Sequence, residues 1–247
     1  RLASQRNDPH HDYPMQYGAI LGSIMARSHV SFLNKIPCVV ACSESLRNTN
    51  LTNGLTTHCI RNGIALSDGQ RIPSEMEKHA MRIKLGIESN AKVFIWCGPF
   101  IPRKMPTFLV SAFDKLGSSQ NVVLCMIGAG PLLSKCKRIV SNNSSIVFPG
   151  FINNVDDYLI AGDVFISSSS AEGLPNSVLE ALSWGLPPIL SDISPHREIL
   201  SLSEGAGALY TGGDFNSLIK LLLSFNPTRE HSNAARSIVV NELSATR

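Results

Sequence analysis

The chain has 247 residues, of which 43% are hydrophobic and 17% charged, a composition typical of a soluble globular protein with one large core or two domains. Its 22 basic and 19 acidic residues leave a net charge of +3, far from the strongly basic balance of a nucleic-acid-binding protein. Every apolar run is shorter than the roughly 18 residues that a membrane-spanning helix needs. The small positive excess is compatible with an anionic ligand, with an acidic membrane surface and with an ordinary mixed surface.

The cysteines indicate reduced core thiols, as in a cytoplasmic protein. Cys38, Cys97 and Cys125 stand in apolar runs. Cys38 and Cys42 are four positions apart, but no matching Cys or His pair lies nearby, so the spacing does not predict a zinc site.

Residues 1–85 predict the end of one α/β domain and a linker. Residues 15–33 have helical periodicity, residues 38–43 and 58–64 predict short strands, and residues 74–85 predict a helix. Because the chain begins in mid-pattern at Arg1, we expect the front of this domain to be missing.

The helix predicted at residues 15–33 has a basic edge. Apolar Ile20, Ile24 and Phe32 stand close to Arg27 and Lys35 in the sequence. We expect the apolar side chains to pack against the sheet of their domain. The alternative is peripheral contact with the inner face of a membrane.

Residues 86–226 alternate short apolar strands with helices. The strands are predicted at 93–97, 122–128, 146–150, 163–167, 187–191 and 207–210. The helices are predicted at 107–116, 132–140, 155–160, 175–184, 196–200 and 215–224. This alternation is typical of an α/β fold with a doubly wound parallel sheet. Residues 227–247 are interpreted as a C-terminal tail or helix.

The loop after the first of these strands predicts an anion site. Right-handed crossovers place every strand-to-helix loop at one edge of the sheet, where ligands of such folds bind. The first loop reads GPFIPRK and carries Gly98, Arg103 and Lys104 just before a helix. Two cations and free backbone N–H groups attract an anion there. The alternative for an Arg-Lys pair is a solvated surface position.

The next two loops carry glycines and an aromatic side chain. Gly128 and Gly130 in GAGP allow the backbone to approach a phosphate closely, although a tight turn is the alternative. Leu133 occupies the place of the third glycine of a dinucleotide fingerprint, which argues against a dinucleotide-binding module. Phe151 follows the next strand and is a candidate to pack on a flat base, with an ordinary core position as the alternative.

The stretch SSSSAEGLPNSVLEAL, residues 167–182, carries two carboxylates. Glu172 lies at the carboxyl end of a strand, and the N–H groups of Gly173, Leu174 and Asn176 can point into the crevice. Glu180 lies about one and a half turns into the helix that follows. The alternative is a structural role for both acids: Glu172 would complement the dipole of the helix that follows, and Glu180 would be a solvated helix residue. This alternative fits Glu172 well. It fits Glu180 less well, because the neighbours of Glu180 are apolar.

Cations, glycines and carboxylates therefore recur at loops that the fold brings together. Phosphates suit the cations and the glycine loops, and carboxylates hold vicinal hydroxyls through paired hydrogen bonds. A nucleoside diphosphate sugar has both features, and we expect it to be the ligand.

These motifs strongly resemble those of the family 4 retaining glycosyltransferases, glycosyl transferases group 1, of the GT-B fold. The resemblance rests on GPFIPRK, GAGP, VFPGF, GDVF and the Glu172–Glu180 pair, over about residues 92–224. It implies that residues 86–226 are the nucleotide-sugar-binding Rossmann-like domain. Residues 1–85 would then be part of the acceptor-side Rossmann-like domain with a linker.

The resemblance also implies a role for each motif. Glu172 would contact the hydroxyls of the donor sugar, and Glu180 the ribose. Arg103 and Lys104 would neutralise the leaving diphosphate. The donor-binding set is Gly98, Gly128, Gly130, Phe151, Gly173, Leu174, Asn176 and Glu180. A hexose would pass, with retention at its anomeric carbon, to a polysaccharide or lipid-linked acceptor, without a metal ion or other cofactor and without nucleic acid.

Two departures from the family pattern keep other functions open. Pro99 stands where many relatives have Arg, and residues 5–8 read QRND where many carry a His turn. The alternatives are a nucleotide-sugar-binding module without transfer and a nucleotide-sugar epimerase of the same fold, which would need no acceptor.

Overall fold

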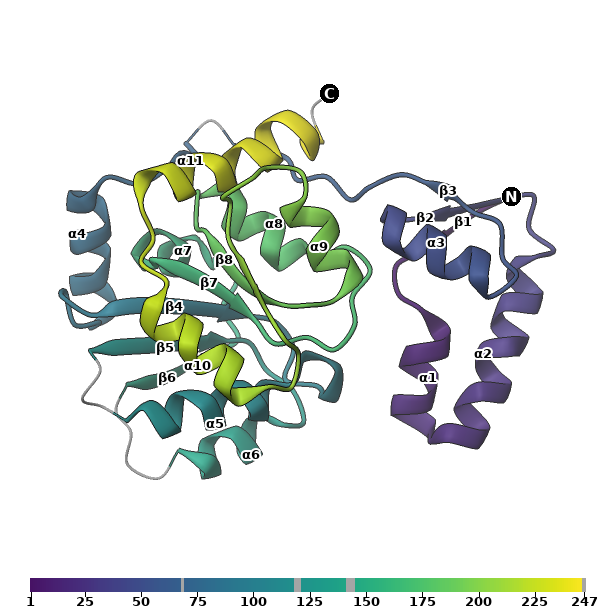
Figure 1. The fold of residues 1–247 in the computed structure, drawn as a ribbon, viewed down its shortest axis with the longest axis horizontal. Coiled ribbons are helices and arrows are strands. Elements are labelled where there is room, and N and C mark those ends of the chain that lie inside the picture. The colour runs from purple at the N-terminus through teal and green to yellow at the C-terminus, as the bar shows by residue number, and fades with distance from the viewer. Residues whose placement is uncertain (68, 118–120, 141–144, 246–247) are drawn as a thin grey trace.

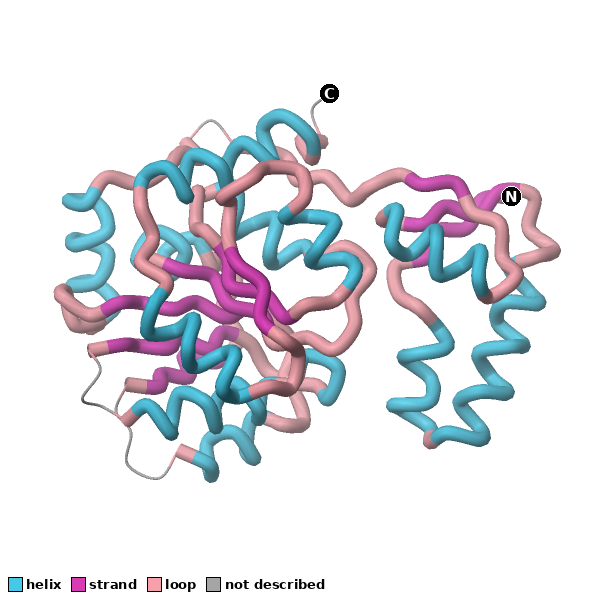
Figure 2. Tube along the Cα trace, in the orientation of Figure 1, coloured by secondary structure: helices cyan, strands magenta, loops and turns pink. Residues whose placement is uncertain are grey.

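The computed structural model describes residues 1–67, 69–117, 121–140 and 145–245. The chain forms a smaller and a larger unit, joined by the segment between β3 and α4 (Figure 1). Each unit has its own parallel sheet with helices packed on it, as the tube in Figure 2 shows for the larger unit.

The smaller unit contains the sheet β1-β2-β3, in which the strands are parallel. Its elements are β1 (Leu2–Gln5), α1 (Pro9–Tyr17), α2 (Ala19–Leu33), β2 (Cys38–Ala41), α3 (Glu44–Thr52) and β3 (His58–Cys59). The predicted strands at 38–43 and 58–64 are confirmed, though both are shorter than expected. Strand β1 and helix α3 were not predicted. Strand β1 spans four residues and places Gln5 beside Ala41, so the turn that follows β1 begins next to β2.

The helical region of the smaller unit differs from its prediction in two ways. The segment 15–33 lies in two helices, because the chain turns at Gly18, whose φ is 82°. The expectation that Ile20, Ile24 and Phe32 pack against the sheet was wrong, since these side chains are 82%, 56% and 65% exposed. The face of α2 that packs is made of small and aliphatic residues at helical spacing, namely Gly22, Ala26, Val30 and Leu33.

The larger unit contains the parallel sheet β6-β5-β4-β7-β8-β9. Its strands are β4 (Lys92–Cys97), β5 (Val122–Ile127), β6 (Ile146–Gly150), β7 (Val164–Ser167), β8 (Pro188–Ser191) and β9 (Ala208–Tyr210). Its helices are α4 (Glu75–Leu85), α5 (Pro106–Leu116), α6 (Leu133–Ile139), α7 (Asp156–Ala161), α8 (Asn176–Ser183), α9 (Ser194–Leu200), α10 (Phe215–Ser224) and α11 (Arg229–Ser237). A 3-10 turn η1 (Pro102–Lys104) and a π-helical turn η3 (Ile238–Glu242) complete it. Each strand and helix predicted within residues 86–226 is confirmed to within about two residues, as is the doubly wound topology.

Both faces of the larger sheet are buried, as its apolar runs predicted. Along β4, Val93 and Ile95 face one core cluster, which they share with residues of α7, α8, α9 and α11. Phe94 and Trp96 alternate to the other face and pack with residues of α5, α6 and α10. These helices hold the sheet so that its strand-to-helix loops meet at one edge.

The C-terminal segment returns to the linker. Helix α11 packs on α8, and η3 then brings residues 243–245 beside Ile64. The N–H of Ile64 donates to the carbonyl of Leu243 at 2.9 Å, and the N–H of Ala245 donates to the carbonyl of Ile64 at 3.0 Å. In the ranges that the structure describes, no helix is both long and apolar enough to cross a membrane.

Candidate active site

A cavity of about 310 Å³ lies where the carboxyl ends of both sheets meet. The larger unit contributes most of the predicted site residues to its lining, namely Gly98, Lys104, Glu172, Gly173, Leu174, Asn176 and Glu180. The smaller unit contributes Arg6, Asn7 and, just beyond β3, Asn62. The cavity is therefore built by both parts of the chain.

Glu172 is the centre of the charged groups at this site. Its carboxylate accepts from Arg103 Nη1 at 2.7 Å and from Lys104 Nζ at 2.5 Å. The Glu172 side chain is only 5% exposed. Burial alone would raise the pKa of Glu172, but the charges of Lys104 and Arg103 outweigh burial and hold the pKa below its usual range. The carboxylate is therefore ionised and fixed between two cations at neutral pH.

The serines before Glu172 position these cations. Ser168 Oγ donates to the carbonyl of Lys104 at 2.8 Å, and the Ser170 N–H donates to the carbonyl of Arg103 at 2.8 Å. Ser191 Oγ in turn donates to the carbonyl of Ser169 at 2.5 Å. The run of small hydroxyls thus joins the loops after β4, β7 and β8 into one framework.

The residues after Glu172 contact the smaller unit. A Cβ added to Gly173 would lie 1.8 Å from the carbonyl oxygen of Arg6, so only glycine fits there. Asn62 Nδ2 donates to the carbonyl of Leu174 at 2.9 Å and to Asn176 Oδ1 at 3.1 Å. These contacts join the two units along one wall of the cavity.

Glu180 has a different electrostatic setting from Glu172. Burial raises its pKa, and repulsion by the carboxylate of Asp156 raises it further. Glu180 faces the same cavity, and among the described residues no cation forms an ion pair with its carboxylate. A carboxylate that lacks a protein partner is free to accept hydrogen bonds from a ligand.

Four predicted site residues do not line this cavity, namely Arg103, Gly128, Gly130 and Phe151. Arg103 reaches Glu172 from a neighbouring hollow that it lines with Asp12. Gly128 has φ 137°, and a Cβ there would lie 2.0 Å from the carbonyl oxygen of Gly98. A Cβ on Gly130 would lie 2.7 Å from the backbone N of Phe100. Both glycines thus allow two neighbouring rim loops to pack together. Phe151 is 76% exposed, so the alternative of an ordinary core position was wrong.

A second cavity of about 270 Å³ lies on the other side of Glu172. Polar side chains from both units line it, among them His11, Ser45, Thr49, Ser170 and Asp192. Glu172 lines this cavity as well as the first. Its carboxylate therefore lies at the junction of two hollows.

Glu198 on α9 was missed by the sequence analysis. Its carboxylate accepts from the N–H groups of Glu44 at 3.0 Å and Ser45 at 2.8 Å, and from Arg61 Nε at 2.8 Å. Glu44 and Ser45 are at the start of α3, so an acid of the larger unit caps a helix of the smaller one. No local pattern signals this contact, because the capping acid and the helix are far apart in the sequence.

Arg6 and Asn62 were also missed as site residues. The rule that ligands bind at the carboxyl ends of parallel strands was applied to the larger sheet alone. Applied to the smaller sheet, it places Arg6 just after β1 and Asn62 shortly after β3. Because the strands of that sheet are short, their sequence pattern did not show where the carboxyl ends of a second sheet lie.

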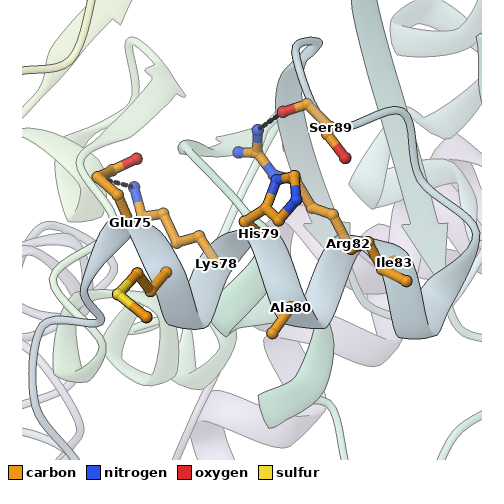
Figure 3. A pocket seen from close by; sticks show the side chains of 8 residues that line it. Glu75, Lys78, His79, Ala80, Arg82, Ile83 and Ser89 are labelled. Carbon is orange, nitrogen blue, oxygen red and sulfur yellow. Dashed lines mark hydrogen bonds and ion pairs between the residues drawn. The ribbon is translucent and has the colours of Figure 1, made fainter.

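Another hollow, on the outer face of α4, shows the contrast with a functional site (Figure 3). Lys78 pairs there with Glu75, and Arg82 Nη1 donates to the carbonyl of Ser89 at 2.9 Å. These polar groups are paired with one another, within α4 and with the segment that follows it. Across the described part of the chain, no group of three or more His, Cys, Asp or Glu side chains is placed to hold a metal ion. The expectation of metal-independent chemistry stays a prediction.

The structure has the GT-B fold. It resembles the crystal structure of Alr3699/HepE from Anabaena in complex with UDP and glucose, with a TM-score of 0.77 at 19% sequence identity. The match covers 89% of this chain and 63% of HepE.

The family follows from the sequence match. The model of the family "Glycosyl transferases group 1" matches residues 91–225, more than half of the chain, and the protein belongs to this family. It is 28% identical over 172 residues to the UDP-Gal:alpha-D-GlcNAc-diphosphoundecaprenol alpha-1,3-galactosyltransferase of Escherichia coli, covering 66% of this chain and 43% of the relative. It is 27% identical over 212 residues to the alpha-monoglucosyldiacylglycerol synthase of Streptococcus pneumoniae, covering 81% of this chain and 48% of the relative. The chain thus spans just under half the length of both relatives.

Proposed function

We propose that this chain is the donor-binding half and catalytic cleft of a retaining glycosyltransferase. It moves a hexose from a nucleoside diphosphate sugar to a saccharide or lipid-linked saccharide acceptor. The proposal rests on the position of Glu172, which holds two cations and lines both the cavity of about 310 Å³ and the cavity of about 270 Å³.

The relatives support the two substrate classes. The name of the Escherichia coli relative gives a UDP-sugar as donor and a diphosphoundecaprenol-linked sugar as acceptor. The HepE structure contains UDP and glucose. The cavity bounded by Gly98, Lys104 and Glu180 would hold the nucleotide sugar, and the polar cavity beyond Glu172 would hold acceptor hydroxyls.

The fixed charges would act on the departing diphosphate. Arg103 and Lys104 are already oriented by Glu172 and by the serine framework, so little reorganisation is needed when negative charge develops beside them. Glu172 would accept hydrogen bonds from the sugar hydroxyls, and Glu180 from the ribose. Departure of the diphosphate and attack by the acceptor on the same face of the sugar would retain the anomeric configuration, with the leaving phosphate taking the acceptor proton.

A binding panel tests the donor assignment. Calorimetric titration with UDP and with 2′-deoxy-UDP, repeated with the GDP pair, should give tighter binding of one ribonucleotide. Glu180→Gln should remove the preference for the ribose form, because it removes the carboxylate that would hold the diol. The exposed Glu230→Gln is the matched control. An unchanged preference in Glu180→Gln contradicts the ribose role.

Product analysis distinguishes transfer from the alternatives. Proton NMR of the glycoside formed from the matching nucleotide sugar should show the donor's anomeric configuration. Inversion would overturn the retaining assignment. Binding without turnover in the presence of acceptor saccharides indicates a binding module, and conversion of the sugar without acceptor indicates an epimerase.

We also propose a cytoplasmic location with peripheral contact at the inner face of the membrane. Helix α2 carries exposed apolar side chains, namely Ile20, Ile24 and Phe32. Basic Arg27 lies on the same helix and Lys35 just after its end, and this combination suits anionic lipid. Vesicles containing phosphatidylglycerol should co-sediment the chain, and Ile20→Ser with Ile24→Ser should reduce this. Equal sedimentation of the double variant contradicts the contact.

A further inference from the structure

Arg6 occupies a fixed backbone position in the cleft. It follows β1 in the smaller unit, and its carbonyl oxygen packs directly on Gly173 of the larger unit. The same carbonyl accepts the thiol of Cys42 at a Sγ···O distance of 3.5 Å. The Arg6 residue is thus held at the wall of the donor cavity by neighbours on both sides.

The charges that line this cavity are unevenly paired. Lys104 lines the cavity and forms its ion pair with Glu172. Arg103, which lies outside the lining, pairs with the same carboxylate and lies 3.6 Å from Asp12. For the guanidinium of Arg6, no ion pair or hydrogen bond is found within the described ranges of the chain. Pro99, which also lines the cavity, adds no charge. Of the described cations that line the cavity, Arg6 is therefore the one without a carboxylate partner.

Glu172 already compensates part of the positive charge of Arg103 and Lys104, so a diphosphate gains from one further cation that has no carboxylate partner. A guanidinium suits it well, because its N–H groups match two phosphate oxygens at once. We propose that Arg6 binds the diphosphate of the donor from the side of the smaller unit, opposite Arg103 and Lys104. This proposal rests on the proposed function, and it names a specific contact that discriminates a nucleoside diphosphate from the bare nucleoside.

The position of Arg6 makes diphosphate binding depend on both units. The anion bridges cations of the larger unit and a cation of the smaller one, so its binding stabilises the closed cleft. Arg6 is exposed, and phosphate contact would therefore weaken as salt is added.

Paired titrations test the assignment. Arg6→Gln should weaken binding of the preferred nucleoside diphosphate by roughly tenfold or more and leave binding of the matching nucleoside unchanged, the range expected for a charge-assisted hydrogen bond. Arg6→Lys should recover part of the loss. Arg1→Gln, which changes an exposed arginine at the other end of β1, is the matched control. Circular dichroism and thermal unfolding verify the fold of each variant.

The outcomes separate the two proposals. Weaker diphosphate binding in Arg6→Gln, with less salt dependence than in the wild type, supports the contact. If the wild type binds a nucleoside diphosphate and Arg6→Gln binds it equally well, the Arg6 assignment is overturned and the proposed function stands. If the wild type binds none of UDP, GDP, ADP, CDP and dTDP, the proposed function falls, and the Arg6 assignment with it.

Discussion

The two units of this molecule differ in how their structure is held. The larger sheet is buried by helices on both faces, and its rim loops are tied together by hydrogen bonds within the same unit. The smaller unit has a modest core around Val30, Leu33, Val39 and Leu55, and much of α2 is exposed. Its Ala41, Cys42 and Leu46 pack into the core cluster of the larger unit. The larger unit therefore fixes its own site residues, whereas the smaller unit is placed by contacts across the cleft.

The largest effect should come from the carboxylate that orders the larger unit's rim. Glu172→Gln removes the charge that holds Arg103 and Lys104, and transfer should fall by about 100-fold or more. Initial rates of transfer to a saccharide acceptor measure this. Glu77 lies on α4 and forms an exposed ion pair with Arg71. Glu77→Gln breaks this pair and should leave the rate unchanged. Equal losses in both variants would contradict a specific role for Glu172.

Gly173→Ala should separate the units more than it disturbs either of them. The new methyl group would meet the carbonyl of Arg6, and such overpacking typically costs about 1–3 kcal/mol. Small-angle scattering should report a more open molecule, with a larger radius of gyration. Gly212→Ala is the control, because a Cβ there meets no atom within 4 Å. A closed Gly173→Ala variant with unchanged stability would contradict the contact.

Glu198→Gln should have a smaller effect, confined to the junction. The neutral amide is a weaker cap for α3 and loses the ion pair with Arg61, a loss of about 1 kcal/mol. Hydrogen exchange at the amides of Glu44 and Ser45 should become faster. Asp214→Asn weakens a cap within the larger unit and should leave those amides protected. Unchanged exchange at Glu44 in Glu198→Gln would show that the cap is dispensable.

The smallest expected effect is on the pH dependence of cleft opening in acid. Burial alone would raise the pKa of Glu198, but Arg61 and the N–H groups of Ser45 and Glu44 outweigh it and lower the pKa. A lowered folded-state pKa stabilises the closed form above the usual value of 4.5, and this stabilisation is lost as pH falls through the folded-state pKa. Scattering from neutral pH down to about pH 3 should show opening. The Glu198→Gln variant should show a smaller acid-dependent change, and an identical profile would rule out its contribution.

The sequence predicted the larger unit well because its signals are local. Alternating buried strands and helices define a doubly wound sheet, and the crossover rule then brings Lys104, Glu172 and Glu180 to one rim. The smaller unit was predicted less well. Its strands are too short for periodicity, and the apolar residues of α2 do not mark its packed face, which is partly made of Gly22 and Ala26.

Local sequence patterns could not predict the contacts across the cleft. Glu198 caps a helix that lies far away in the sequence, and Gly173 fits a carbonyl of Arg6. The roles of the glycines also could not be distinguished. Gly128 was predicted to approach a phosphate, and the structure shows it packed on Gly98, a contact that requires glycine without any ligand.

The pairing of Ile64 with residues 243–245 has a consequence for how the protein is made. The ribosome releases the smaller unit and the linker long before it adds Leu243 and Ala245. Until then the backbone N–H and C=O of Ile64 lack these partners, and the linker is free to take other paths. The linker around Ile64 therefore completes its backbone hydrogen bonds only when the last residues to be synthesised have folded back onto it.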